Sequence, residues 1–208
     1  MNNADKVILD LCGGTGSWSK PYKDAGYDVR LITLPANDVR NYEPPPGVYG
    51  ILAAPPCTMF SFARTRGDKV PRNLDKGMET VLACLRIIWQ CQKQLKSQYQ
   101  QVPPLRFWAM ENPWGMLNWF IGHPAFTFDP WEFGDFYTKK TCLWGYFNSP
   151  AKTWHIKPTT RKYDQLTVNE LSTIRGLPTV ANIGTKRRQE LRSITPAGFA
   201  TAFFEANR

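Results

Sequence analysis

The sequence predicts an α/β fold, with a mostly parallel sheet and flanking helices, in a single domain that spans residues 1–208. Residues 6–11 are a short apolar run that leads into a glycine-rich turn at residues 12–18, and another apolar run follows at residues 28–33. A strand, a turn that opens a helix and a second strand make a βαβ unit, whose strands are parallel. Residues 73–95 then carry apolar side chains at the spacing of a helix.

The other elements follow in order along the chain. Residues 34–40 are too few for a second full helix. Residues 48–54 are a continuous apolar run with prolines on both sides, which predicts a buried strand. We expect further strands at 105–110 and, near the edge of the sheet, at 141–147, an aromatic-rich loop at 126–134, and helices at 168–174, 185–191 and 196–206.

The composition limits the class of partner. A formal net charge of +9 and a pI near 9.4 indicate a polyanionic partner, most often nucleic acid, although a basic surface without such a role is also compatible with them. The five cysteines form no CxxC or Cys/His cluster, so we expect no metal site and a reduced, cytoplasmic protein. We find no apolar run long enough to cross a membrane, and expect no membrane partner.

Cys57 follows the strand predicted at residues 48–54, after two prolines that keep the chain extended. In open α/β sheets, ligands bind beyond the carboxyl ends of the strands, so the thiol is placed where chemistry takes place. A packed structural cysteine is the ordinary alternative, and the position alone leaves both interpretations open.

Three stretches occur in the order found in a known enzyme family: Asp10–Gly16, Pro55–Cys57 with Phe60 and Ser61, and Glu111–Pro113. Together they resemble the DNA cytosine-5 methyltransferases, in particular the small bacteriophage-encoded members. The resemblance implies a Rossmann-like fold, S-adenosylmethionine as cofactor, S-adenosylhomocysteine as product, DNA as partner and the cytoplasm of a bacterial host as location.

By this resemblance, Cys57 is the nucleophile that adds to carbon 6 of cytosine, so that carbon 5 can take the methyl group. We expect nearby positive charge or backbone N–H groups to lower the pKa of Cys57. Glu111 would hold a proton on the ring nitrogen, and Asn112 would brace the loop of Cys57. Lys140 lies nearest to the last arginine of the family's Gln-x-Arg-x-Arg motif, which this chain lacks.

The resemblance also implies a cofactor site. One departure concerns the ribose, since Thr33 to Pro35 stand where the family has an acid. The expected cofactor-binding residues are Asp10, Cys12, Gly13, Gly14, Thr15, Gly16, Trp18, Asp38, Pro55, Ser193 and Thr195.

Nucleic-acid contacts are expected beside the nucleophile and in a basic, aromatic-containing stretch near residues 151–162. The second stretch could equally be an ordinary solvated loop. Because the recognition region is reduced to about residues 148–166, we expect short or relaxed sequence specificity, with room for a separate target-recognition partner. The expected contacts are Ser61, Arg64, Arg66, Lys152, Lys157 and Arg161.

Other functions remain open at this point. The same active site could act on single-stranded DNA, RNA or a free cytosine nucleotide, because little of a recognition region is present. A catalytically silent module that binds DNA or a protein partner is a second alternative. A cysteine hydrolase is disfavoured, since neither His123 nor His155 has a motif context.

Overall fold

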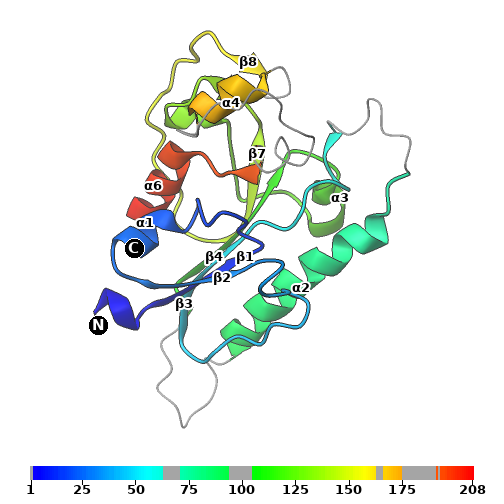
Figure 1. Ribbon diagram of the computed structural model, residues 1–208, viewed down its shortest axis with the longest axis vertical. Coiled ribbons are helices and arrows are strands. Elements are labelled where there is room, and N and C mark those ends of the chain that lie inside the picture. The colour runs from blue at the N-terminus through cyan, green and yellow to red at the C-terminus, as the bar shows by residue number, and fades with distance from the viewer. Residues whose placement is uncertain (1, 63–70, 94–104, 163–165, 175–190, 192) are drawn as a thin grey trace.

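The centre of the protein is a six-stranded sheet with the order β2-β1-β3-β4-β7-β5 (Figure 1). The computed structural model describes residues 2–62, 71–93, 105–162, 166–174, 191 and 193–208. The pairs β1–β2, β1–β3 and β3–β4 are parallel, whereas β7 is antiparallel to both β4 and β5. The strands are β1 (Val7–Leu11), β2 (Asp28–Ile32), β3 (Val48–Ala53), β4 (Phe107–Pro113), β5 (Phe126–Phe128) and β7 (Thr141–Tyr146).

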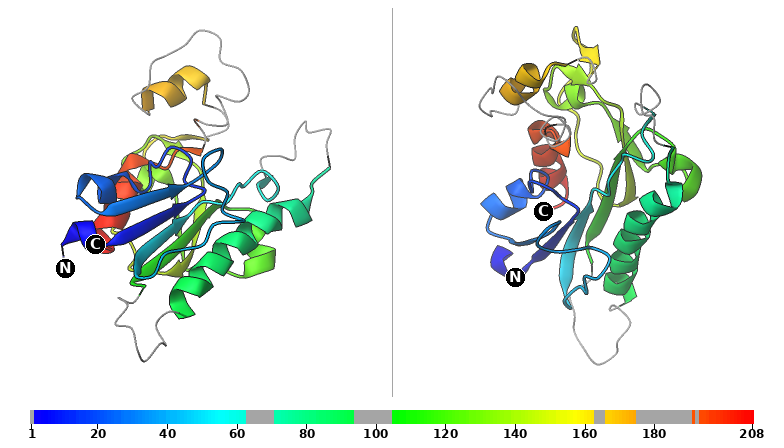
Figure 2. Two further views of the ribbon diagram at one scale, coloured as in Figure 1. Left: turned by 60° about the horizontal axis from the view of Figure 1, so that its bottom comes forward. Right: turned by 45° about the vertical axis from the view of Figure 1, so that its right-hand side comes forward.

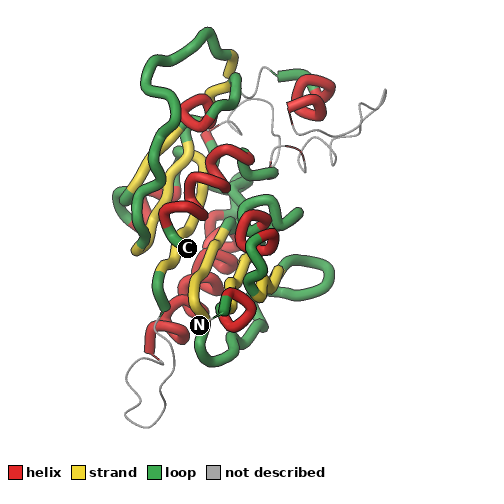
Figure 3. Tube along the Cα trace, turned by 90° about the vertical axis from the view of Figure 1, so that its left-hand side faces the viewer, coloured by secondary structure: helices red, strands yellow, loops and turns green. Residues whose placement is uncertain are grey.

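Helices flank both faces of this sheet, with α2 on one face and α1 and α6 on the other (Figures 1, 2 and 3). The expected α/β class, with a mostly parallel sheet and flanking helices, is therefore confirmed. The helices are α1 (Lys20–Asp24), α2 (Leu74–Lys93), α3 (Leu117–Ile121), α4 (Val168–Ile174) and α6 (Ala197–Ala206), and short 3₁₀ turns are η1 (Asn3–Asp5) and η4 (Pro130–Phe133).

The sheet divides the core into two layers, because successive side chains of a strand point to opposite faces. In β1, Leu9 packs in the layer of α2, whereas Ile8 packs in the layer of α6. The second layer is rich in aromatic rings, and Phe199 of α6 stacks on Phe128 of β5 with ring centroids 4.0 Å apart. Both layers are closed to solvent, and the central strands β1, β3 and β4 carry mostly apolar side chains on both sides.

The chain order creates a topological switch point beside β1. From β1 the chain passes to β2 on one side, and β3 then pairs with the other side of β1. Crevices for ligands form at such points, outside the carboxyl ends of parallel strands. The segments that follow β1 and β3 are the glycine-rich turn and the loop of Cys57, so the topology places both at this crevice.

Several local expectations differ from the structure. β4 continues through Pro113, because residues 111–113 pair with Thr141–Leu143 of the antiparallel β7. Glu111 and Asn112 therefore lie within a strand and not after it. β5 and α3 were not expected. β7 lies near the edge of the sheet, as expected, and β5 forms the outer edge beside it. The helix expected at residues 185–191 lies almost wholly outside the described residues.

The stretch at residues 148–166, which the resemblance identifies with a reduced recognition region, contributes a strand to a small second sheet. Its strand β8 (Arg161–Lys162) pairs in parallel with β6 (Tyr137–Thr138), just before β7. In Figure 1, β8 and α4 lie above the carboxyl ends of the central strands. Among the described helices, none is long and apolar enough to span a lipid bilayer.

The contact of α6 with the sheet yields a first prediction. Phe199→Ala removes a fully buried ring that stacks on Phe128, so we expect the free energy of unfolding to fall by about 3–5 kcal/mol. Thr201→Ala, at an exposed position of the same helix, should change it by about 0.5 kcal/mol or less. Urea denaturation measures both, and equal losses in the two variants would contradict the packing described here.

Candidate active site at the carboxyl ends of the strands

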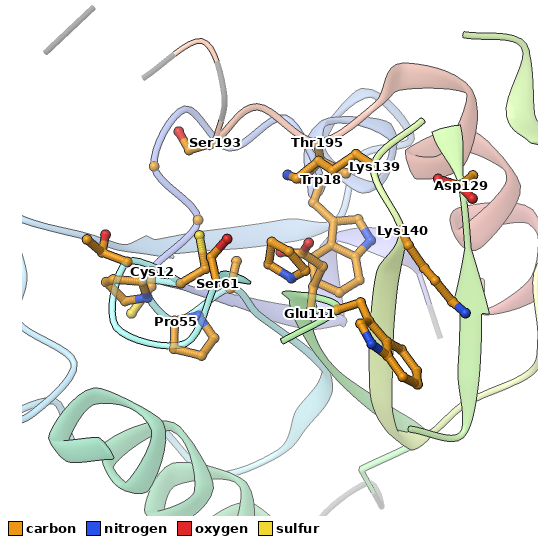
Figure 4. Close-up of a pocket in the computed structure, with 18 of the residues that line it drawn as sticks. Cys12, Trp18, Pro55, Ser61, Glu111, Asp129, Lys139, Lys140, Ser193 and Thr195 are labelled. Carbon is orange, nitrogen blue, oxygen red and sulfur yellow. The ribbon is translucent and has the colours of Figure 1, made fainter. Parts of the chain in front are cut away.

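A cavity of about 830 Å³ opens at the switch point. Its walls come from the segments after β1, β3 and β4, from the stretch that links β5 to β7, and from the residues before α6 (Figure 4). The lining residues are Asp10, Cys12, Gly13, Gly14, Trp18, Ala54, Pro55, Pro56, Cys57, Thr58, Ser61, Glu111, Pro113, Trp114, Asp129, Thr138, Lys139, Lys140, Lys157, Lys162, Ser193 and Thr195.

The glycine-rich turn closes tightly over the end of β1. A Cβ atom on Gly13 would lie 2.1 Å from the Oδ1 atom of Asp10, so only glycine fits there. Gly14 has a φ of 56° and Cys12 a φ of 58°, in the left-handed region where glycine is favoured and other residues are uncommon. The turn thus brings bare backbone to the cavity wall, where it can approach a ligand closely.

Asp10 is a fully buried carboxylate at the base of this turn. Ser19 donates its hydroxyl hydrogen to Oδ2 of Asp10, whereas Oδ1 has no hydrogen-bond partner among the described residues. Burial raises the pKa of Asp10 from 3.8 to about 6, although the hydrogen bonds from Ser19 act in the opposite direction. A buried acceptor without a donor is costly, so this atom is suited to a donor or cation on a ligand.

The C-terminal segment forms a further wall of the cavity. The backbone N–H of Thr195 donates to the hydroxyl of Ser17 at 2.9 Å, which ties this segment to the glycine-rich turn. Trp18 is held from behind by Phe203 of α6, with ring centroids 5.4 Å apart in an edge-on arrangement. Figure 4 shows Ser193, Thr195 and Trp18 around one part of the cavity.

Cys57 occupies a tight turn after β3. The backbone N–H groups of Phe60 and Ser61 both donate to the Cys57 carbonyl, at 3.0 and 2.9 Å. Asn112, fully buried in β4, donates from Nδ2 to the carbonyl of Pro55 at 2.8 Å. This bond joins the Cys57 turn to the strand that carries Glu111, so the two side chains are fixed relative to each other.

The expectation that the pKa of Cys57 is lowered is wrong. Burial is the largest influence and raises the pKa of the thiol; the positive charge of Lys139 lowers it in part, and the negative charge of Glu111 raises it further. The thiol is therefore neutral in the resting protein at pH 7. The sequence places Cys57 beside apolar strands, but it does not show how far burial outweighs the neighbouring charge.

Glu111 also has a raised pKa. Burial is again the main cause, and Lys139 partly opposes it. The charge of Lys139 thus acts on both Cys57 and Glu111. Lys140, which was singled out from the sequence, instead lies with its Nζ atom 4.4 Å from the centre of the Trp114 ring. Figure 4 shows that the two lysines, which lie in the link between β6 and β7, extend in different directions.

The cavity unites most of the residues expected from the sequence. Three expected groups lie elsewhere: Asp38 pairs with Arg40 at 2.6 Å, Lys152 with Glu132 at 2.7 Å, and Arg161 with Glu170. Thr15 and Gly16 do not line the cavity, and Asn112 lies behind its wall. Arg64 and Arg66 fall outside the described residues. The expected residues that line the cavity are Asp10, Cys12, Gly13, Gly14, Trp18, Pro55, Cys57, Ser61, Glu111, Lys140, Lys157, Ser193 and Thr195.

Sequence reasoning missed several lining residues. Lys139 adjoins Lys140, and the pair of lysines was a signal that either could face the cavity. Asp129 lies at the end of the unexpected β5; the Lys139 backbone donates to it, and burial raises the pKa of its carboxyl. Lys162 and Thr138 line the cavity because they belong to the paired strands β6 and β8. Each of these strands has only two residues, which is too short for a periodic pattern in the sequence.

The cavity has the features that a cationic, nucleoside-bearing cofactor requires: an orphaned carboxylate oxygen at Asp10, bare backbone at Gly13, and the buried indole of Trp18, whose N–H has no partner among the described residues. S-adenosylmethionine carries a positive sulfonium and an ammonium group, so these residues fit it. No cluster of metal ligands occurs in the described part of the chain.

Comparisons with known proteins do not assign the chain to a class. No known protein family has a model that matches this sequence, and no curated protein matches it significantly.

The pKa of Asp10 gives a prediction of pH dependence. The unfolded carboxyl ionises near pH 3.8 and the folded one near pH 6, so the folded state binds the extra proton between these values. The free energy of unfolding should therefore fall by about 3 kcal/mol as the pH rises through this window. Asp10→Asn cannot ionise, and its stability relative to the original protein should rise by that amount between about pH 4 and pH 7. Urea denaturation across this pH range measures it; a constant difference would contradict the assignment.

Lys139 and Lys140 form a matched pair for a further test. Removing the charge in Lys139→Met should raise the pKa of Cys57 and slow its alkylation by iodoacetamide at about pH 8 by roughly three-fold or more. Lys140→Met should leave the rate nearly unchanged, because that charge acts on Asp129 and Cys142. Peptide mass spectrometry can follow Cys57 separately from the other thiols. An equal change in the alkylation rate in the two variants would show that the charge of Lys139 does not act specifically on the Cys57 thiol.

Proposed function

We propose that this protein is a single-domain, Rossmann-like methyltransferase that uses S-adenosylmethionine to methylate carbon 5 of cytosine in DNA. The observation that carries the proposal is that Cys57 and Glu111 line one cavity together with the glycine-rich turn of β1. Three separate strands deliver these groups to one edge of the sheet. A purely structural cysteine and a surface carboxylate would not be expected to line the same cavity at the carboxyl ends of the strands.

The cofactor would be held by the turn after β1 and by the C-terminal wall. Asp10 would accept from its ammonium group, Trp18 would pack against it, and Ser193 and Thr195 would close the site. S-adenosylmethionine supplies an electrophilic methyl group on its sulfonium sulfur. Because Asp10 has a pKa near 6, it is ionised at pH 7 and offers negative charge to that cation.

Cys57 has two tasks in the proposed reaction. Its sulfur forms a bond to carbon 6 of the base, which moves electron density onto carbon 5. Since the pKa of the thiol is raised in the resting protein, its proton must pass to solvent water as the bond between sulfur and carbon 6 forms. Once carbon 5 carries the methyl group, its proton passes to solvent water. The electron pair left behind re-forms the double bond between carbons 5 and 6 and expels the Cys57 sulfur, which restores the aromatic ring and the free enzyme.

Glu111 is suited to the complementary task. Its raised pKa favours the protonated carboxyl, which can donate a hydrogen bond to ring nitrogen 3 as negative charge develops during the addition of sulfur. Lys139 influences the protonation of both groups, because its positive charge favours the ionised forms of Cys57 and Glu111. Lys157 and Lys162 add positive charge to the cavity wall and would contact phosphate groups.

A second function is favoured by the raised pKa of Cys57. A silent module with this fold would bind DNA or a protein partner, and its neutral thiol would have no substrate to attack. The residues proposed to hold the cofactor are the same for the methyltransferase and for the silent module. The two functions therefore differ in turnover and not in cofactor binding.

The test is transfer of labelled methyl from S-adenosylmethionine to unmodified DNA, supplied both as duplex and as single strand, followed by mass spectrometry of the nucleosides. We expect 5-methylcytosine, and Cys57→Ser should lower the rate by roughly 10⁴-fold or more while the affinity for the cofactor stays within about two-fold. Thr58→Ala, at the next position of the cavity wall, serves as the control. Cofactor binding without product would support the silent module, and turnover by Cys57→Ser would remove Cys57 from its role.

A further inference from the structure

Four exposed aromatic side chains lie in the two segments that border the cavity at Ser61 and Trp114. Trp119 is 69% exposed, and its neighbour Phe120 is 46% exposed, although both belong to the short helix α3. Phe62 and Trp114 are each about 40% exposed. These four residues, which we call the aromatic surface, hold much apolar area in water, and such area marks a binding surface.

The four residues come from two neighbouring segments of the chain. An isolated bridge between Ser61 and Gly115 brings the segment of Phe62 beside the segment of Trp114. Phe62 and Trp119 lie with ring centroids 6.0 Å apart, and the ring of Phe120 contacts the buried Phe60 at 6.1 Å. The rings therefore come from two segments, one after β3 and one after β4, that meet beside the active-site cavity.

The backbone beneath this surface is firmly held. Arg72 donates to the carbonyls of Met59 and Ser61, at 2.7 and 2.8 Å. The backbone N–H of Met116 donates to the carbonyl of Phe60 at 2.9 Å. Rings on a fixed backbone can accept a flat partner with little loss of conformational entropy.

The aromatic surface is continuous with the cavity and lies beside positive charge. Ser61 and Trp114 line the cavity themselves, so the surface begins at its wall. The Nζ atom of Lys140 lies over the Trp114 ring, and Lys139 lines the same cavity. Aromatic rings next to lysines, on a chain with a net charge of +9, match the needs of stacked bases and phosphates and not those of an apolar protein surface.

We infer that the aromatic surface binds unpaired bases of single-stranded DNA that flank the base held in the cavity. The bases of a duplex are already stacked on one another, whereas each base of a single strand has free faces for Trp119 and Phe62. The inference rests on the proposed function, because it takes the cavity beside Cys57 as the place of the target base. It adds the substrate class: the protein prefers single-stranded to duplex DNA.

Binding can be measured without any methyl transfer. The probe is a fluorescently labelled 12-nucleotide oligothymidine, read by anisotropy at low salt, with a blunt duplex of the same length as comparison. We expect the single strand to bind at least about ten-fold more tightly, and Trp119→Ala to weaken it by about 5- to 100-fold. Trp119→Phe, which keeps an aromatic face, should restore most of the affinity. Trp89→Ala is the matched control, since Trp89 is 53% exposed on α2 but does not line the cavity.

Single abasic positions in the oligonucleotide make the test specific for stacking. Removing one base should weaken binding to the original protein but have little further effect on Trp119→Ala, because the partner ring is already absent. Equal penalties in both proteins, tighter binding of the duplex, or no loss in Trp119→Ala would overturn the inference, and the surface would then suit a protein partner. Since oligothymidine contains no cytosine, none of these results depends on whether the protein methylates DNA.

Discussion

The hydrogen bond from Asn112 to the carbonyl of Pro55 is the contact on which the active site depends. It is buried, it joins β4 to the turn after β3, and it lies behind the cavity wall. Without it, a carbonyl and an amide would be buried without partners, and the turn of Cys57 would lose its fixed distance from Glu111. The rigid prolines hold the chain extended, and this bond relates the turn directly to Asn112 of the neighbouring strand.

Burial governs the electrostatics of the cavity. Asp10, Cys57 and Glu111 all have pKa values raised by desolvation. Ser19 offsets this in part for Asp10, and Lys139 does so for Cys57 and Glu111. In such a site the ionised forms of all three groups are less favourable than they are in water. Ligand binding and ionisation are therefore coupled, since each cation that enters makes the ionised form of its partner more favourable.

The sequence predicted the layers of the fold well, because strands buried on both faces and a long amphipathic helix leave clear patterns. It also located the turns of Gly13 and Cys57, because each turn directly follows one of these buried strands. It did not predict that Glu111 lies within β4, since that depends on pairing with β7, which is distant in sequence. Nor did it distinguish Lys139 from Lys140, because both lie in the link between β6 and β7, whose path is set by tertiary contacts. The aromatic surface joins two distant segments and left no local signal.

The bond between Thr195 and Ser17 has a consequence for the order of assembly. It spans 178 positions of the chain, so the cavity wall is a contact of very high sequence separation. During synthesis, the turn of β1 leaves the ribosome long before its partner exists, and the sheet can form while the site is still open on one side. Any ligand that needs both walls can therefore bind only after the last helix has docked, which makes ligand binding a reporter of complete folding.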